Sequence, residues 1–223
     1  ANPSKPIPSP DIPESFQKLR PWVHHGWEMV LLTAESIRTS SQLNVSGWQA
    51  FSNNYQEECS KALEIWKWKP NELQEALDNA RRKKISHDFD HWLKSHQPFP
   101  YIVQRLQKLK SENIELAVLT TKSVEFTQHL LNSCNLEPTL VFGHESGSKT
   151  KVLSELAKDR VIMGFIEDRR NTLEAVINDP ELSYIPCFLA SWGYLKPKDL
   201  TNLPLGIHLL DPTTLKKPLE RWS

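Results

Sequence analysis

The spacing of hydrophobic residues along the chain changes near residue 98. Between residues 14 and 97 they recur at helical spacing, which predicts helices over 22–38 and 49–66 and a third after Asn71. Asn71 is predicted to cap that third helix, because Gln74 stands at the capping-box position three residues later. The first part of the chain is therefore expected to be entirely helical.

After residue 98, short apolar runs alternate with helical patterns. The predicted strands are 114–119, 140–142, 161–166, 186–190 and 207–210. The predicted helices between them are 101–109, 124–132, 150–158 and 171–177. Strands that alternate with helices form a parallel sheet with helices on both of its faces. The second part of the chain is therefore predicted to be an α/β domain.

The first thirteen residues carry five prolines, which disfavour both a helix and a central strand. We therefore predict three segments: a proline-rich linker at 1–13, a helical domain at 14–97 and an α/β domain at 98–223. A further segment is expected upstream of this linker.

Charge and composition exclude several classes of protein. Lysine plus arginine and aspartate plus glutamate number 27 each, so no basic excess indicates nucleic acid or an anionic membrane as partner. No apolar run reaches membrane-spanning length. The three cysteines are Cys59, Cys134 and Cys187, with no CxxC pair, which favours reduced thiols and a cytoplasmic location.

Polar side chains follow the strands of the α/β part at three places. Thr120 and Thr121 follow the first predicted strand, Lys149 precedes a helix, and Glu167 with Asp168 follow the apolar run 161–166. Ligands of α/β proteins bind at the carboxyl ends of the strands. A hydroxyl can bind phosphate there, and paired acids suit Mg²⁺, which prefers oxygen ligands. Taken singly, each residue could instead be a helix cap or a first-turn acid.

The order of these residues resembles motifs II, III and IV of the haloacid dehalogenase superfamily. The run 116–122 (LAVLTTK) resembles motif II, Lys149 is similar to the motif III lysine with Lys151 as a less well placed substitute, and 164–173 (GFIEDRRNTL) resembles motif IV. The resemblance implies a Rossmannoid parallel-sheet core with an α-helical cap domain inserted after motif I.

Most members of that superfamily are Mg²⁺-dependent phosphatases, so the resemblance implies hydrolysis of a small phosphorylated metabolite through an aspartyl-phosphate. Thr120, Lys149 and Asp168 would be catalytic, Thr121 would contact substrate, and Glu167 with Asp168 would hold Mg²⁺. Glu167 and Asp168 favour a phosphatase over a dehalogenase, because dehalogenases need no metal.

The helical part resembles a cap that selects the substrate. Its run 19–29 (LRPWVHHGWEM), like 188–194 (FLASWGY), resembles a haloacid dehalogenase-like family from photosynthetic organisms. The cap residues predicted to face the substrate are Arg20, His24, Trp27 and Glu28.

One departure from the superfamily pattern concerns motif I, a DxD whose first aspartate is the nucleophile. The one DxD here, Asp88-Phe89-Asp90, lies in a polar helical context rather than after a strand. Without the motif I strand, its two neighbours would stand about 10 Å apart with unpaired backbone groups. We therefore expect that strand upstream of Ala1, and expect residues 1–223 alone to be inactive.

Two other motifs in the sequence could carry chemistry. The run 143–150 nearly matches the P-loop pattern of nucleotide-binding proteins, but Ser148 replaces its second glycine. His87 and His91, four residues apart with acids between them, could hold a metal on a helix, although a solvated polar face is the commoner reading.

The remaining alternative is a non-catalytic pseudoenzyme or binding module. If no nucleophile is present, the pocket could still bind phosphate or a partner. Trp27, Trp68 and Trp92 would then be candidates for a contact surface.

Overall fold

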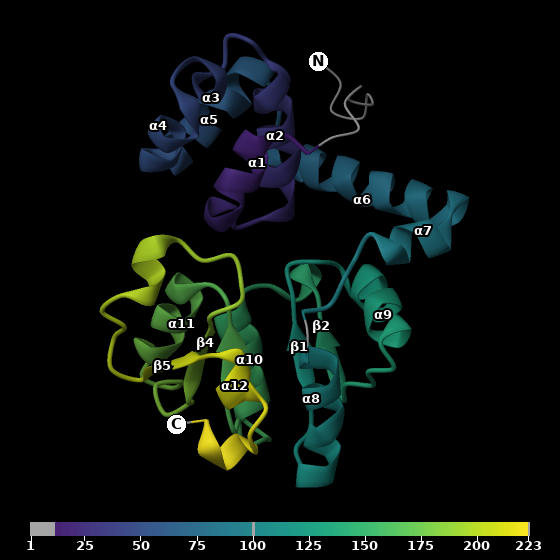
Figure 1. Ribbon diagram of the computed structural model, residues 1–223, viewed down its shortest axis with the longest axis vertical. Coiled ribbons are helices and arrows are strands. Elements are labelled where there is room, and N and C mark those ends of the chain that lie inside the picture. The colour runs from purple at the N-terminus through teal and green to yellow at the C-terminus, as the bar shows by residue number, and fades with distance from the viewer. Residues whose placement is uncertain (1–11, 100, 223) are drawn as a thin grey trace. The chain divides into compact units, whose positions relative to one another are not determined.

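The structure is a computed structural model that describes residues 12–99 and 101–222. The chain divides into two compact units, Ala1–Lys94 and Ser95–Ser223. Most of the predicted proline-rich linker lies outside the described residues. Each unit is considered by itself (Figure 1).

The first unit is entirely helical in its described part. Its elements are α1 (Glu14–Leu19), η1 (Arg20–Trp22), α2 (Gly26–Ile37), α3 (Gln42–Val45), α4 (Gly47–Asn53), α5 (Tyr55–Trp66), α6 (Pro70–His87) and α7 (Phe89–Lys94).

The apolar faces of these helices meet in one core. Leu31 of α2, Phe51 of α4 and Leu73 of α6 have no exposed surface, and Ala62 of α5 is 1% exposed. Removing such side chains from water is the main driving force for packing short helices, which are unstable alone. The helical spacing in the sequence therefore located the core of this unit.

The helix ends differ from the sequence prediction at three places. The predicted helix 22–38 begins at Gly26, because the η1 turn and an extended Val23 precede it. The predicted helix 49–66 breaks at Asn54 into α4 and α5. Asn71 is not an N-cap: Lys69 takes that position, since Pro70 is preorganised for the first helical residue.

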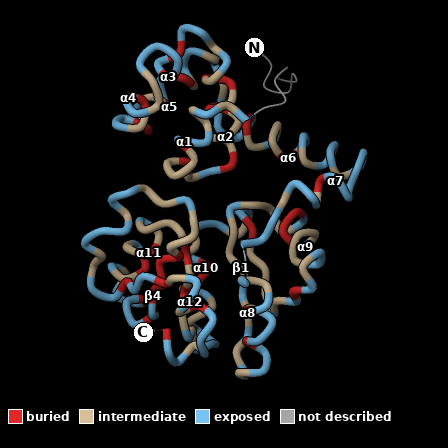
Figure 2. Tube along the Cα trace, in the orientation of Figure 1, coloured by how far each residue is buried: buried red, intermediate tan, exposed pale blue. Residues whose placement is uncertain are grey.

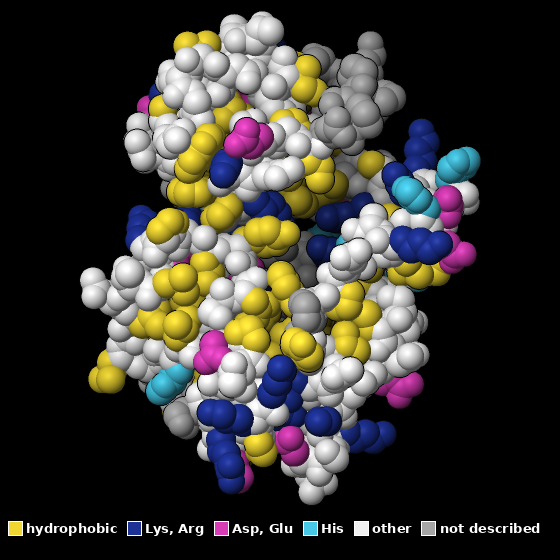
Figure 3. Space-filling model, in the orientation of Figure 1, with side chains coloured by type: hydrophobic (Ala, Val, Ile, Leu, Met, Phe, Trp, Pro, Cys, Tyr) yellow, Lys and Arg dark blue, Asp and Glu magenta, His cyan; other side chains and the backbone are white. Residues whose placement is uncertain are grey.

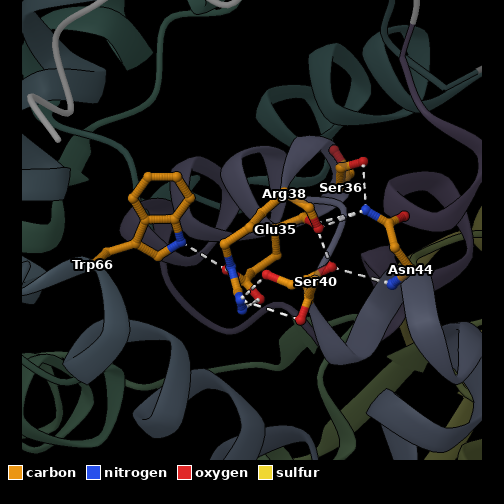
Figure 4. Close-up of polar contacts among 7 residues, drawn as sticks. Glu35, Ser36, Arg38, Ser40, Asn44 and Trp66 are labelled. Carbon is orange, nitrogen blue, oxygen red and sulfur yellow. Dashed lines mark hydrogen bonds and ion pairs between the residues drawn. The ribbon is translucent and has the colours of Figure 1, made fainter.

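A buried carboxylate ties the helices of this unit together (Figure 4). Glu35 of α2 is 1% exposed and accepts hydrogen bonds from Arg38 Nε at 2.9 Å and Arg38 Nη2 at 2.6 Å. Trp66 Nε1, at the end of α5, donates to the same carboxylate at 2.6 Å. The Glu35 main-chain oxygen accepts from Ser41 Oγ and Asn44 Nδ2. A buried charge needs such pairing, so the network has a structural role.

The second unit alternates strands with helices as predicted. Its strands are β1 (Ala117–Leu119), β2 (Leu140–Phe142), β3 (Phe165–Glu167), β4 (Cys187–Ala190) and β5 (Ile207–Leu210). Its α-helices are α8 (Ile102–Lys108), α9 (Val124–Ser133), α10 (Lys149–Ala157), α11 (Arg170–Ile177) and α12 (Pro212–Leu215). Short 3-10 turns are η2 (Leu109–Glu112), η3 (His144–Ser146), η4 (Pro197–Leu200) and η5 (Leu219–Arg221).

The strands form two separate pieces of parallel sheet. β1 pairs with β2, and β3, β4 and β5 pair in that order. In Figure 1, β4 and β5 lie on one side of α10, and β1 and β2 lie on the other. All four residues of β4 are buried, whereas Ala117 of β1 is exposed (Figure 2). The larger core therefore surrounds β4.

Two strands are half as long as predicted. The apolar run 161–166 was expected to be a buried strand, but β3 begins at Phe165, and Val161 and Met163 are 83% and 56% exposed. Pairing starts there because Phe165 N–H bonds to the Pro186 carbonyl, just before β4. The predicted strand 114–119 likewise shrinks to β1. Both shortened strands lack a partner on one side in the part of the chain that the structure describes.

The predicted α/β class with parallel strands is confirmed. No helix among residues 12–99 and 101–222 combines the length and the apolar character needed to cross a membrane.

Candidate functional site

The two pieces of sheet in the α/β unit lie alongside one another. Arg160, ahead of β3, forms an ion pair with Glu115, ahead of β1. At the other end, Leu119 packs against the apolar cluster that contains Phe165. The segments ahead of β1 and β3 are therefore linked to each other, and the last residue of β1 packs against the core that contains the first residue of β3. Both strands end at one edge of the unit, where the predicted site residues stand.

Thr120 follows β1 at this edge. Its N–H continues the ladder to Phe142 at 2.9 Å, and its Oγ1 accepts from the Lys122 N–H at 3.1 Å. A hydroxyl that accepts one hydrogen bond can still donate its own hydrogen, as a phosphate oxygen would require. Thr121 is the next residue and is exposed. The structure thus places both threonines at the strand end.

The first turn of α9 has its amide groups occupied within the chain. Glu145 accepts from the Val124 N–H at 2.9 Å, and Ser123 Oγ accepts from the Phe126 N–H at 3.4 Å. The N–H groups of a helix N-terminus can bind a phosphate when they have no other partner. These two donors already have partners, so the threonine side chains are the better candidates for anion contact.

Lys149 and Glu167 form an ion pair between the first turn of α10 and the last residue of β3. The Glu167 side chain is 5% exposed and the Lys149 side chain 22%. Burial raises the pKa of Glu167, although the neighbouring Lys149 ammonium acts in the opposite direction. Glu167 Oε1 also accepts from the Arg169 N–H at 3.1 Å. The predicted motif III lysine and motif IV acid are therefore in direct contact.

Asp168 is the next residue and is only partly buried. Its Oδ2 accepts from the Tyr194 N–H at 3.2 Å, so the turn after β4 holds its carboxylate. The Asp168 charge also favours the protonated form of Glu167, which indicates that the two carboxylates are close. Two acids share this strand end with one ammonium group.

These residues fit a divalent cation in part. Carboxylate oxygens are the ligands that Mg²⁺ prefers, and it takes six in octahedral geometry. Within the described ranges, no group of three or more histidine, cysteine, aspartate or glutamate residues could hold a metal. Glu167 and Asp168 therefore supply a partial ligand set, which other groups must complete.

The four predicted cap residues belong to the helical unit. Arg20 is in η1, and His24 and Trp27 are partly buried near the start of α2, where the Trp27 ring stacks on His25. Glu28 requires a correction. It is 6% exposed, and its Oε2 accepts from the His24 N–H at 2.5 Å and from Tyr55 Oη at 3.1 Å. Its carboxylate points into the helical core and does not line a cleft.

The other candidate motifs find ordinary local roles. His87 ends α6 and His91 lies in α7, so the two histidines do not share one helical face. Asp88 separates the helices, and its Oδ1 accepts from the His91 N–H at 2.9 Å. The single DxD therefore spans a junction of two helices, where the sequence predicted a helical context, and it does not follow a strand.

In the run that resembles a P-loop, Ser148 is the N-cap of α10. Its Oγ accepts from the Lys151 N–H at 3.2 Å, and the Lys149 ammonium pairs with Glu167. In the surface proposed for a binding module, Trp92 is 4% exposed and belongs to the interior. These contacts therefore support neither a nucleotide-binding site at the P-loop-like run nor a contact surface that includes Trp92.

The sequence analysis missed the groups that arrange this edge. The Tyr194 N–H comes from the turn after β4, and the Glu145 carboxylate, which binds the Val124 N–H of α9, comes from η3. The run 188–194 was noted only for its resemblance to a family. A backbone donor has no side-chain signature, so its role required the fold.

Comparison with known proteins gives one result. A family model described as haloacid dehalogenase-like hydrolase matches residues 29–171, more than half of the 223 residues. The matched stretch includes Thr120, Lys149, Glu167 and Asp168. No curated protein and no solved structure matches the chain.

Proposed function

Because the chain belongs to the haloacid dehalogenase-like hydrolase family, we propose that it is a Mg²⁺-dependent phosphatase for a small phosphorylated metabolite. The observation that carries this proposal is the contact of Lys149 with Glu167, which is followed in the chain by Asp168. The finer resemblance to a family from photosynthetic organisms stays a prediction.

The nucleophile is proposed to lie on a strand between β1 and β3. Within the described residues, each of these strands pairs on one side only, β1 with β2 and β3 with β4. Unpaired buried backbone groups are costly, so such edges favour a partner. One inserted strand separates its neighbours by about 10 Å.

The surface supports the same placement. Figure 3 shows hydrophobic side chains gathered on the visible face of the α/β unit, over β1 and toward β4. Val161 and Met163, ahead of β3, are exposed although apolar. A hydrophobic strand inserted here would cover apolar surface and complete a continuous parallel sheet. Its carboxyl end would bring an aspartate beside Asp168 and Thr120.

Each site residue then has a role that follows from its chemistry. The Thr120 hydroxyl and the Lys149 ammonium would bind phosphoryl oxygens, whose charge must be neutralised in the transition state. Thr121 would contact the substrate from the same loop. Asp168, assisted by Glu167, would hold Mg²⁺, which when bound supplies further charge neutralisation at the phosphoryl group. The Lys149–Glu167 pair would keep the ammonium aimed at this edge.

We propose that the helical part, residues 14–97, is the cap and that residues 98–223 are the core. Arg20, His24 and Trp27 remain the proposed substrate contacts of the cap; Glu28 does not. The free thiols of Cys59, Cys134 and Cys187 suit the reducing, cytoplasmic location predicted from the sequence.

Hydrolysis of p-nitrophenyl phosphate by the natural protein, with and without Mg²⁺, tests the function. Asp168→Asn is expected to abolish Mg²⁺-dependent turnover while the thermal unfolding temperature stays within a few degrees. Asp159→Asn, which alters an exposed acid of the same unit, is the control and should retain activity. Turnover that survives in Asp168→Asn would remove this residue from the site.

A non-catalytic phosphate-binding protein is the second candidate. It is favoured by one observation: the single DxD of the sequence lies at the α6–α7 junction and not after a strand. It predicts Mg²⁺-dependent binding of inorganic phosphate without turnover, which isothermal titration of the natural protein would detect.

A further inference from the structure

The turn after β4 passes so close to Asp168 that one of its residues has no room for a side chain. A Cβ atom placed on Gly193 would lie 2.1 Å from Asp168 Cβ and 2.8 Å from Asp168 Oδ2. The φ angle of Gly193 lies outside the left-handed region, so the backbone itself would accept another residue. Residue 193 must therefore be a glycine for steric reasons, because a Cβ atom there would overlap with the side chain of Asp168.

The turn is fixed to the sheet by two backbone hydrogen bonds. The Ser191 N–H bonds to the Leu210 carbonyl at 3.0 Å, and the Gly193 N–H bonds to the Ala190 carbonyl at 3.2 Å. Ala190 and Leu210 are the buried last residues of β4 and β5. Because the turn is anchored in the core, it cannot easily move away from Asp168.

The neighbouring residue supplies the contact that orients the carboxylate. The Tyr194 N–H donates to Asp168 Oδ2 at 3.2 Å, and this bond fixes the rotation of the carboxyl group. The bond exists because the Gly193 backbone can approach Asp168 closely. A methyl group at residue 193 would push the carboxylate off the Tyr194 N–H.

We propose that Gly193 is a positioning residue that, together with the Tyr194 N–H, holds the Asp168 carboxylate in the orientation that binds the cation. This inference rests on the proposed function for the role of Asp168. It adds a specific requirement: the turn Ser191–Tyr194 and the end of β3 form one unit, and the identity of residue 193 sets the affinity for Mg²⁺.

A double-mutant cycle on the full chain tests the contact. The variants are Gly193→Ala, Asp168→Gly and the two combined, and the readout is the thermal unfolding temperature without Mg²⁺. Gly193→Ala should lower this temperature by roughly 3–8 °C, the usual effect of overpacking in a protein of this size. When Asp168 is replaced by glycine, adding Gly193→Ala should have almost no effect on the unfolding temperature, because the side-chain atoms that would overlap with the new methyl group are absent.

The Mg²⁺ concentration that half-maximally raises the unfolding temperature tests the positioning role. Gly193→Ala should weaken this apparent affinity about tenfold or more, as loss of a group that orients a metal ligand does. Gly164→Ala is the matched control. Its Cβ would lie 2.9 Å from the Phe188 ring, so it also overpacks the unit, but it should leave the Mg²⁺ response unchanged.

The outcomes separate the inference from the proposed function. Additive effects in the cycle, or an unchanged Mg²⁺ affinity in Gly193→Ala, would overturn the inference. If Gly193→Ala fails to fold and Asp168→Gly restores folding, the contact is supported. If Mg²⁺ does not stabilise even the wild-type protein, the proposed cation role of Asp168 fails, while coupling in the cycle would still establish that Gly193 holds this side chain.

Discussion

The Lys149 ammonium and the Glu167 carboxylate form an ion pair that joins the first turn of α10 to the last residue of β3. The two residues are far apart in sequence, yet the pair lies at the edge where Thr120 and Asp168 also stand. Since Glu167 is almost fully buried, the lysine stabilises a charge that would otherwise be costly there. The same ammonium is proposed to bind phosphoryl oxygens.

Replacement of Lys149 by methionine should destabilise the protein by about 2–3 kcal/mol at neutral pH. Loss of one partner of a buried pair costs about 3–5 kcal/mol, and Lys149 is partly exposed. Burial would then raise the pKa of Glu167 further. In the folded state Glu167 would therefore keep its proton at pH values above 4.5, the ordinary pKa of a glutamate side chain. Stability of the variant should fall as pH rises through that window.

Urea unfolding at pH 5 and pH 8 measures this effect. The difference between wild type and Lys149→Met should be larger at pH 8, because a raised pKa leaves Glu167 protonated more often at the lower pH, and the protonated form does not need the ammonium. Lys149→Arg keeps the charge and serves as the control. Equal destabilisation by methionine at both pH values would mean that the pair adds little to stability.

Lys149→Ala should lower kcat of the natural protein about 10²–10³-fold, the usual effect of removing one group that stabilises transition-state charge. The assay is Mg²⁺-dependent hydrolysis of p-nitrophenyl phosphate under saturating substrate. A change in KM alone, with kcat preserved, would make Lys149 a binding charge only.

Glu35→Gln in the helical unit should reduce the free energy of unfolding by about 2–3 kcal/mol. The neutral amide cannot replace the paired bonds to Arg38, and the Trp66 indole loses a charged acceptor. Urea titration measures the change, with Glu64→Gln at an exposed site of α5 as control. Similar stabilities for the two variants would contradict a structural role for Glu35.

The three thiols should differ sharply in reactivity. Burial raises the pKa of Cys187 to about 11, and burial with the nearby Glu28 charge raises that of Cys59 to about 12. Because the thiolate is the reactive form, only the partly exposed Cys134 should react with a disulfide reagent at pH 8 in the folded protein. All three should react in denaturant. Fast reaction of two thiols, or of one thiol in Cys134→Ser, would contradict this packing.

The sequence predicted those features that depend on local pattern. β2 and β5 have the predicted bounds, because each is a short apolar run between polar turns. The run 161–166 has the same character, yet only Phe165 and Ile166 of it entered β3, since a strand extends only as far as its partner does. Asn54 interrupts a continuous helical pattern through backbone geometry that apolar spacing does not encode.

The candidate site was predictable only where its side chains form a recognisable pattern in the sequence. Thr120, Lys149, Glu167 and Asp168 carry side chains whose order resembles known motifs, and the structure brings Lys149 into contact with Glu167, next to Asp168. Glu28 was predicted to face the substrate because of its place in the run 19–29. The direction of its side chain depends instead on Tyr55, which lies 27 residues later and donates a hydrogen bond to it. The Tyr194 N–H and the space at Gly193 involve backbone atoms brought to Asp168 by β4. Sequence patterns do not record such contacts between distant segments.

Intact-mass spectrometry of the protein purified from its natural source, combined with the p-nitrophenyl phosphate assay with and without Mg²⁺, tests the proposed phosphatase function. The claim is that a strand carrying the nucleophile fits between β1 and β3 and completes the site around Asp168. It predicts a mass well above 25.8 kDa and Mg²⁺-dependent turnover that Asp168→Asn abolishes. A natural protein of 25.8 kDa without turnover, or turnover that persists in Asp168→Asn, would contradict it.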